Sequence, residues 1–303
     1  YVVQSMHYRG IVQGDKISQS SCEKSARGTL NRWDDKQECF GVPIVLQPCR
    51  ENVFSKSICS SIVLQDSSVT LWNETYRDYY HPKSGAYRQA KELFIEKSDL
   101  RNRLKKGDVK LLDIGFGMGY NTLCALEVAQ SLAQNTLHIK AMDQDRMLLQ
   151  QSMNIVPNAS HAILLEALFN NNVYENTFAN IAFLNVEARY GVTLLKESFD
   201  VIFLDPFIES NNASLVTFDF FKIVQKLLKP DGILVASTSL QAVHDGLMLA
   251  GFDVCIVNDE KSDIKGITAR LSSSSILPAK EPYRDPYGIY SDKQIETLHQ
   301  KSS

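Results

Sequence analysis

The chain has 303 residues, of which 44% are hydrophobic and 22% charged, and this balance is typical of a folded globular protein rather than a disordered or fibrous one. A formal net charge of -3 and a pI near 6.1 argue against nucleic-acid binding through overall basicity, so such a partner needs a local basic patch. No apolar run is long enough to span a bilayer, so we expect no membrane insertion. The six cysteines form no C-x-x-C pair, so we expect free thiols and no bound metal.

Residues 1–60 show weak periodicity and no motif, and we interpret them as an N-terminal extension of unknown role. Residues 61–104 first alternate apolar and polar side chains around the turn-prone Asp66-Ser67-Ser68, which predicts a hairpin. Apolar residues then recur with helical spacing from about Ser84 to Leu100. Basic residues in and after this helix are candidates for phosphate contacts, with a solvated helix face as the alternative: Lys91, Lys97, Arg101, Arg103, Lys105 and Lys106.

From residue 105 onward the pattern alternates between strands and helices. Short apolar runs predict strands at 109–114, 137–143, 181–185, 199–205, 233–238, 252–257 and 266–271. Helices are predicted at 120–133, at 217–228 and up to 249, with a turn at 229–232. Buried strands joined by helices predict an α/β fold with a doubly wound, mostly parallel sheet. The last two strands are close in sequence and predict an antiparallel edge hairpin, so we expect one domain over 105–290 and a tail over 291–303.

A glycine-rich segment lies where the first of these strands meets its helix. Gly115, Gly117 and Gly119 allow tight turns and let a ligand approach the main chain, and Asp113 stands two residues ahead. This G-x-G-x-G spacing differs from the dinucleotide spacing G-x-G-x-x-G and is the form that methyltransferases use to bind S-adenosylmethionine. A structural turn without a ligand is the alternative interpretation.

Three further acids fall at the ends of predicted strands. Asp143 closes the second strand, where a carboxylate can accept hydrogen bonds from both ribose hydroxyls. Glu187 follows the third strand and is placed to accept from the adenine amino group. Asp205 ends the fourth, at the rim where ligands of open α/β sheets bind. Each acid alone could be a helix N-cap or a surface residue, but their common position favours one shared site.

The tripeptide Asp205-Pro206-Phe207 indicates how a methyl acceptor could be bound. In-line displacement at a sulfonium requires the acceptor lone pair to lie opposite the leaving sulfur. Asp205 can accept a hydrogen bond from a neutral amine and aim its lone pair, while Phe207 offers a face to a flat base or to the cationic donor. A strand-ending Asp-Pro turn is the alternative.

A second cluster of interest, Tyr80 and His81 ahead of Gly85, lies upstream of the sheet. Aromatic and histidine side chains of this kind often serve core packing. Because residues 61–104 precede the sheet, they can also fold over the ligand as a hairpin and helix cap.

Six segments resemble, in this order, the MnmC-like methyltransferases: "TLWNETYRDYYHPKSGAYRQAKELF", "LLDIGFGMGYNT", "FDVIFLDPF", "LLKPDGILVAST", "GFDV" and "EPYRDP". The resemblance covers about Gln65 to Pro286 and implies a Rossmann-like class I methyltransferase fold. It implies that S-adenosylmethionine is surrounded by Asp113, Gly115, Gly117, Gly119, Asn121, Asp143 and Glu187. Asp205 would contact the cofactor and the acceptor, with Tyr80, His81 and Gly85 beside the pocket.

Three acceptor-side loops depart from the family pattern. Asp66-Ser67 replaces Asp-Gly, Val216 stands at the place of a Trp, and Ser237-Thr238 replaces Tyr-Ser. These loops border the acceptor, so a divergent acceptor or a loss of activity stays open.

The resemblance implies an N-methyltransferase that converts the 5-aminomethyl group of a tRNA wobble (2-thio)uridine to 5-methylaminomethyl. The tRNA anticodon loop would be its partner, and a separate oxidase would supply the aminomethyl intermediate because no second glycine fingerprint follows. The expected location is the cytoplasm, or an organellar stroma or matrix in a eukaryotic host. Two other functions stay open: a small-molecule amine methyltransferase or aminopropyltransferase of the same fold, and a non-catalytic S-adenosylmethionine-binding partner protein.

Overall fold

A computed structural model describes residues 60–205, 213–259 and 264–272, all within one compact unit. The proposed N-terminal extension up to residue 59, Phe207, the EPYRDP segment and the tail lie outside the described residues. Within the described ranges, no helix combines the length and the apolar character that a membrane crossing requires.

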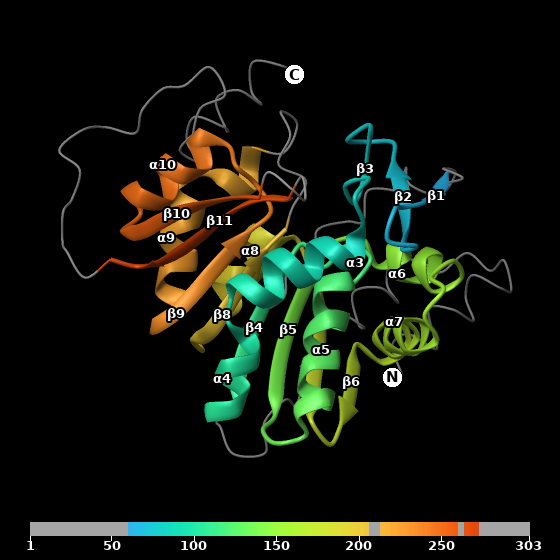
Figure 1. Ribbon diagram of the computed structural model, residues 1–303. Helices are drawn as coiled ribbons and strands as arrows, with labels where there is room; N and C mark the ends of the chain where they lie inside the picture. The colour runs from blue at the N-terminus through green and yellow to red at the C-terminus, as the bar shows by residue number, and fades with distance from the viewer. Residues whose placement is uncertain (1–59, 206–212, 260–263, 273–303) are drawn as a thin grey trace, which may run out of the picture. The chain divides into compact units, whose positions relative to one another are not determined.

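An eight-stranded sheet forms the centre of the molecule, with the spatial order β10-β11-β9-β8-β4-β5-β7-β6 (Figure 1). Neighbouring strands among β9, β8, β4, β5 and β7 pair in parallel, whereas β6, β11 and β10 pair antiparallel at the two edges. This arrangement confirms the predicted fold class, including the antiparallel C-terminal hairpin. The strands are β4 (Val109–Ile114), β5 (Leu137–Asp143), β6 (Val173–Asn176), β7 (Ala179–Asn185), β8 (Phe199–Leu204), β9 (Leu228–Ala236), β10 (Phe252–Asp259) and β11 (Ile264–Leu271).

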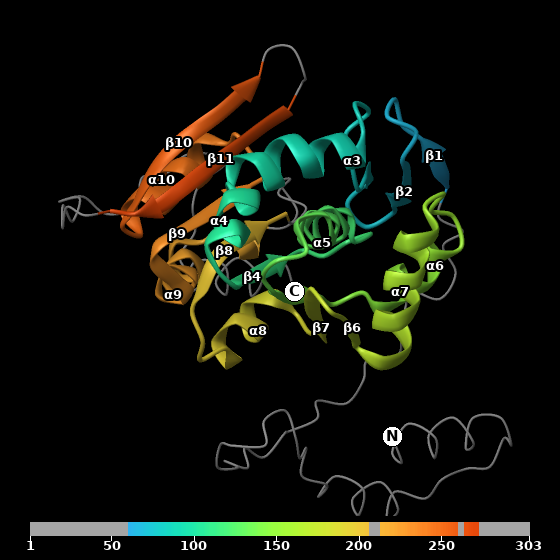
Figure 2. The same cartoon turned by 60° about the horizontal axis from the view of Figure 1, so that its bottom comes forward.

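Helices cover both faces of this sheet (Figures 1 and 2). One face packs against α3 (Ala86–Gln89), η1 (Ala90–Ile95), α4 (Leu100–Lys106), α5 (Tyr120–Leu132), α6 (Arg146–Met153) and α7 (Ala159–Asn171). The other packs against α8 (Ala188–Leu194), η2 (Ala213–Val216), α9 (Phe218–Leu227) and α10 (Gln241–Leu249). Both faces of the central strands are therefore buried, as the continuous apolar runs predicted.

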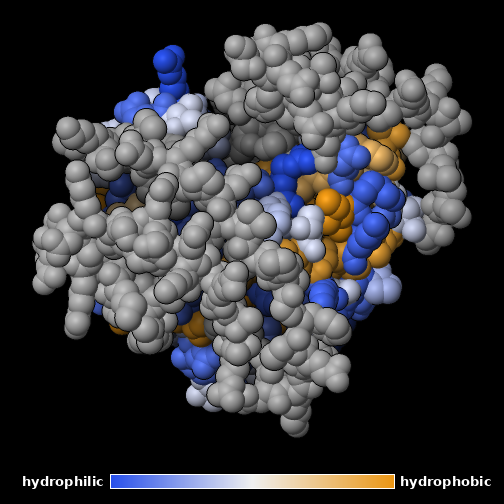
Figure 3. Space-filling view, turned by 180° about the vertical axis from the view of Figure 1, so that it is seen from behind, coloured by the Kyte–Doolittle hydropathy of each residue, from blue (hydrophilic) through white to orange (hydrophobic). Residues whose placement is uncertain are grey.

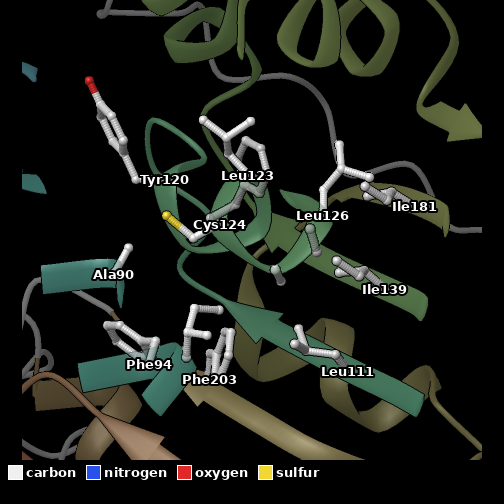
Figure 4. Packing of buried hydrophobic residues seen from close by; sticks show 14 of the residues in the cluster. Ala90, Phe94, Leu111, Tyr120, Leu123, Cys124, Leu126, Ile139, Ile181 and Phe203 are labelled. Carbon is white, nitrogen blue, oxygen red and sulfur yellow. The ribbon is translucent and has the colours of Figure 1, made fainter. Parts of the chain in front are cut away.

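Alternation along the strands divides the core into two layers. Leu111 and Leu112 are both wholly buried, yet they belong to opposite layers because successive side chains of a strand point to opposite faces. In the first layer, Phe94 of η1 faces Phe203 of β8 with ring centroids 5.0 Å apart (Figure 4). This aromatic contact thus holds the π-helix η1 against the sheet.

A small antiparallel sheet precedes the main one, with strands β1 (Ser61–Val63), β2 (Val69–Asn73) and β3 (Asp78–Tyr79). The predicted hairpin around Asp66 is confirmed by the pairing of β1 with β2. The Asp66 carboxylate accepts hydrogen bonds from the backbone N–H of Ser68 at 3.0 Å and of Arg88 at 2.8 Å. The hairpin turn is therefore tied to the start of the α3–η1 helix.

Two local predictions need correction. The helix expected up to Leu100 breaks at Asp99, which has a positive φ of 56°, and α4 follows it as a separate helix. The turn expected at 229–232 is part of β9, where the pairing with β8 shifts register between Phe199 and Val201. Lys229 donates hydrogen bonds to Asp200 at 2.8 and 2.9 Å, so the irregular segment stays on its partner strand.

Candidate cofactor and acceptor site

The glycine loop connects β4 to α5 in a left-handed backbone conformation. Gly117 has a φ of 55° and Gly119 a φ of 84°, values that side chains disfavour. A Cβ on Gly119 would stand 2.6 Å from the ring of Phe116, so packing alone requires glycine there. A Cβ on Gly117 would lie in ordinary van der Waals contact with the ring of Tyr80, at 3.7 Å, so backbone conformation rather than crowding favours glycine there. The approach of a ligand to this main chain stays a prediction.

Asp143 holds this loop against the neighbouring strand. Its carboxylate accepts hydrogen bonds from the backbone N–H of Gly117 and of Asp145, at 2.8 and 2.9 Å. Burial raises the pKa of Asp143 above its usual range, and these two hydrogen bonds oppose that rise. Asp143 thus lies beside the main chain of Gly117.

Asp113 lies beneath the loop on β4 and is wholly buried. One of its oxygens accepts a hydrogen bond from Thr122 at 2.6 Å, while Oδ1 has no hydrogen-bond partner among the described residues. Burial raises the pKa of Asp113 to about 7; the Thr122 hydroxyl opposes this rise, and the charges of Asp205 and Asp143 add to it. Three of the predicted acids therefore interact in one place, which favours a ligand with positive charge.

Asp205 completes this group at the end of β8. Its backbone N–H donates to the carbonyl of Ile114 at 2.9 Å, which fixes it beside the end of β4. Its carboxylate accepts hydrogen bonds from Asn121 Nδ2, at 2.8 Å from Oδ2, and from the Ser237 hydroxyl. Burial raises the pKa of Asp205, and both hydrogen bonds lower it again. Sequence reasoning missed this role of Ser237; its position directly after the strand next to β8 was the available signal.

Glu187 occupies the start of α8 and is exposed. Its side chain accepts hydrogen bonds from the backbone N–H of Arg189 and Tyr190, at 3.0 and 3.1 Å. This is the N-cap arrangement that stood as the alternative interpretation. The expected contact of Glu187 with adenine stays a prediction.

Tyr80 and Gly85, predicted to lie beside the pocket, have different surroundings in the structure. The Tyr80 hydroxyl accepts a hydrogen bond from Asn73 Nδ2 at 2.8 Å, and its ring lies beside Gly117. Gly85 has a φ of 131°, and a Cβ there would stand 2.0 Å from the Asp66 carboxyl group, so packing explains the glycine. Tyr80 is therefore next to the loop, whereas a pocket role of Gly85 stays a prediction.

Tyr120, which sequence reasoning did not single out, joins the hairpin to the loop. Its hydroxyl donates to the carbonyl of Val69 at 2.8 Å and accepts from the Val69 N–H at 3.1 Å. Its ring meets His81 and His161 edge to face, with centroids 5.0 and 4.6 Å apart. In Figure 4 the Tyr120 hydroxyl points away from the buried cluster. The small sheet is thus fixed to the first turn of α5.

Both histidines of this stack are neutral at physiological pH. Burial lowers the pKa of His81 to about 3, and a ring nitrogen of His81 lies 3.1 Å from the Thr70 hydroxyl. Burial likewise lowers the pKa of His161 to about 4, and Nε2 of His161 donates to the carbonyl of Met118 at 2.7 Å. The expected place of His81 beside the pocket stays a prediction, while His161 supports the glycine loop directly.

Among the candidate basic residues, those of α4 lie at the other end of the parallel strands. Helix α4 leads into the amino end of β4, whereas the glycine loop follows its carboxyl end (Figure 1). Lys105 and Lys106 are exposed there, and Arg103 donates to the carbonyl of Asp231 at 2.9 Å.

From behind, the described surface mixes apolar and hydrophilic side chains (Figure 3). In the described ranges no three His, Cys, Asp or Glu side chains are grouped to hold a metal ion.

Comparison with known proteins identifies the class to which this site belongs. Residues 151–267 match the family model described as S-adenosyl-L-methionine-dependent methyltransferase. An uncharacterized protein of Methanocaldococcus jannaschii is 25% identical over 262 residues, which cover 78% of this chain and 70% of that protein. The structure of MnmC2 from Aquifex aeolicus has the same fold, with a TM-score of 0.63 at 24% identity, over 81% of this chain and 76% of that one.

Two bifunctional relatives carry the name tRNA 5-methylaminomethyl-2-thiouridine biosynthesis bifunctional protein MnmC. The protein of Marinomonas sp. is 25% identical over 195 residues, or 59% of this chain and 29% of that protein. The protein of Burkholderia thailandensis is 28% identical over 202 residues, or 60% of this chain and 31% of that protein. The matched region thus spans less than a third of either relative.

The parallel sheet, the glycine loop and the family match over residues 151–267 together support an S-adenosylmethionine-dependent methyltransferase. Within that class the chain is MnmC-like, which confirms the predicted resemblance. The residues also fit the cofactor, because the glycines put no side chain over the main chain after β4 and the unpartnered oxygen of Asp113 belongs to a group of acids that suits a sulfonium cation.

Proposed function

We propose that this methyltransferase acts on the 5-aminomethyl group of a (2-thio)uridine at the tRNA wobble position and forms 5-methylaminomethyluridine. The names of the bifunctional relatives support this acceptor, because they place that nucleoside among the products of similar chains. The observation that carries the proposal is the Asp205 carboxylate, which two hydrogen bonds hold at the end of β8. A carboxylate in this position suits an amine acceptor.

Asp205 has the chemistry that such an acceptor needs. When bound, S-adenosylmethionine supplies a methyl group by in-line displacement at its sulfonium. The acceptor nitrogen must be neutral and must keep its lone pair directed at that carbon. By accepting a hydrogen bond from the amine N–H, Asp205 orients the lone pair. As the C–N bond forms and the C–S bond breaks, the nitrogen becomes positive, and its proton passes to Asp205 and then to water.

The tRNA has to present the base outside its stack. A stacked base cannot enter a crevice at the end of a parallel sheet, so the wobble uridine must be splayed out of the anticodon loop. Exposed Lys105 and Lys106 are proposed to contact phosphates further along the stem, because α4 lies at the opposite end of the strands from Asp205. A separate oxidase is proposed to supply the aminomethyl intermediate, in the cytoplasm or an organellar matrix.

A turnover assay with defined tRNA tests this proposal. The protein is incubated with S-adenosylmethionine and tRNA that carries 5-aminomethyl-2-thiouridine, and the digested nucleosides are analysed by mass spectrometry. We expect one methyl group to be added at the wobble position. Transfer to free amines with none to tRNA would instead identify a small-molecule methyltransferase. Cofactor binding without any turnover would identify a non-catalytic partner protein.

Asp205→Ala is the variant that links the assay to the site. We expect its turnover to fall by at least roughly 10²-fold, as loss of a positioning base does, with cofactor affinity nearly intact. Calorimetry measures the affinity, and single-turnover kinetics measures the rate. A fully active variant would show that the carboxylate only ends the strand.

A further inference from the structure

We propose that Asn121 and Ser237 are positioning residues that clamp the Asp205 carboxylate toward the acceptor, so that Ser237 belongs to the acceptor side of the site. The clamp rests on the proposed function of Asp205, because it gives that carboxylate its direction. The resemblance assigns Asn121 to the cofactor and places the loop of Ser237 and Thr238 beside the acceptor, but it gives Ser237 no contact with Asp205.

The clamp brings together three segments that are distant in sequence. Asp205 ends β8, Asn121 lies in the first turn of α5, and Ser237 directly follows β9. The sheet order places β8 between β4 and β9, so both flanking elements reach the end of β8. Backbone hydrogen bonds fix the same positions: the Asp205 N–H donates to Ile114, and the Ser237 N–H donates to Leu204 at 3.2 Å.

Each carboxylate oxygen has its own donor, which fixes the plane of the group. Asn121 Nδ2 donates to Oδ2 at 2.8 Å, and the Ser237 hydroxyl donates to Oδ1. Rotation about the Cβ–Cγ bond of Asp205 would break both bonds at once. Since a carboxylate oxygen accepts two hydrogen bonds, each keeps one lone-pair position for an amine N–H. The carboxylate is thus held rigidly while it can still bind the acceptor.

The same two donors favour the ionised form of Asp205. From the elements packed around this group, α5 presents Asn121, the end of β9 presents Ser237, and β4 presents the Asp113 carboxyl group. Burial and the nearby acid both disfavour a second negative charge, whereas hydrogen bonds donated to the charged form stabilise it. Removing the Ser237 hydroxyl should therefore raise the pKa of Asp205 and shift the acid limb of the turnover profile to higher pH.

The test combines a titration with kinetics on Ser237→Ala, Ser237→Thr and the matched control Ser239→Ala, whose hydroxyl is on an exposed residue. The Asp205 carboxyl group is titrated by carbon-13 NMR in the protein without acceptor, and its signal is assigned by its loss in Asp205→Asn. We expect a raised pKa in Ser237→Ala, recovery toward the original value in Ser237→Thr, and no change in Ser239→Ala.

Kinetics shows whether Ser237 acts through Asp205. Loss of one hydrogen bond to a charged group should lower kcat of Ser237→Ala roughly tenfold or more, with the Kd of S-adenosylmethionine unchanged. In the Asp205→Asn background the same substitution should have a much smaller effect. Asn121→Ala should follow the same pattern; a large loss of cofactor affinity in that variant would instead remove Asn121 from the clamp.

The outcomes separate the clamp from the proposed function. An unchanged titration of Asp205 in Ser237→Ala would overturn the clamp, whatever the acceptor is, and so would additive effects in the double variant. A shifted titration in a protein that methylates no tRNA would overturn the proposed substrate while supporting the clamp. Thermal melting of each variant verifies that it is folded.

Discussion

Buried carboxyl groups set the chemistry of the site at the scale of single residues. Asp113 has an oxygen without a partner in the described part of the chain, and Asp143 and Asp205 add negative charge close to it. Uncompensated charge of this kind is costly in a protein interior. A cationic cofactor bound beside these acids would relieve that cost.

Cofactor affinity should therefore depend on pH through Asp113. Its pKa of about 7 means that the group is protonated in mild acid and ionised above neutrality. Because the ionised form attracts the sulfonium, affinity should rise as pH increases through 7 and level off about one unit above the pKa. Calorimetry from mild acid to about two units above the pKa measures this rise and its plateau. Asp113→Asn should flatten it, and S-adenosylhomocysteine, which lacks the positive sulfur, should show a weaker dependence.

Gly117 should be essential for the cofactor because a side chain would cover the main chain that the ligand is expected to approach. Gly117→Val adds strain at a φ of 55° and blocks the approach of a ligand to the main chain, so we expect cofactor binding to be lost. Gly107→Val is the matched control: Gly107 has an extended φ of 170°, and its Cβ position has no atom within 4 Å. Equal affinities of the two variants would refute the assignment of the loop.

At the scale of elements, the hairpin is attached to the site rather than separate from it. Tyr120 bonds to both backbone groups of Val69, as a neighbouring strand would, and Asp66 holds the start of α3. Tyr80 reaches Gly117 from the same hairpin. These contacts hold the small sheet of β1, β2 and β3 beside the glycine loop.

Removing the Tyr120 hydroxyl should loosen the attachment of the small sheet to α5. Tyr120→Phe leaves both groups of Val69 without their partner, which we expect to cost about 1–3 kcal/mol in the free energy of unfolding. Hydrogen exchange should speed up over residues 69–80, while the main sheet keeps its protection. Tyr174→Phe on β6 is the control, and equal exchange in both variants would contradict the role of Tyr120.

At the scale of the whole molecule, the predicted site residues other than Phe207 all lie between residues 80 and 205. They are placed by the main sheet and the hairpin, both within the described ranges. Cys124 and Cys255, the described cysteines, are free, so no disulfide ties these elements together. Within the described ranges, packing, sheet order and side-chain hydrogen bonds hold the site.

Deleting residues 1–59 should therefore spare cofactor binding. The described hydrogen bonds of the glycine loop and its acids come from partners after residue 59. Calorimetry with S-adenosylmethionine compares the shortened and the full chain, and thermal melting verifies that both are folded. If affinity disappears while the shortened chain stays folded, the N-terminal residues contribute to the site.

One strand of the main sheet and three helices that pack on it were not apparent in the sequence. Strand β6 and helices α6, α7 and α8, between Asp143 and Phe199, were not predicted. The segment "AILLEALF" within α7 is an apolar run without a clear polar face, and such runs do not distinguish a buried strand from a helix. Tertiary burial, not local pattern, decides their structure.

The sequence by itself determined where the core strands lie along the chain, the glycine loop and the acids at the strand ends, because these depend on local alternation and backbone freedom. The tertiary structure alone decided which side chains meet. Asn121 and Asp205 are 84 residues apart, and Val69 and Tyr120 are 51 apart. Their contacts follow from the sheet order, which sets β8 beside β4 and packs the hairpin on α5, and no local pattern in the chain encodes those neighbours.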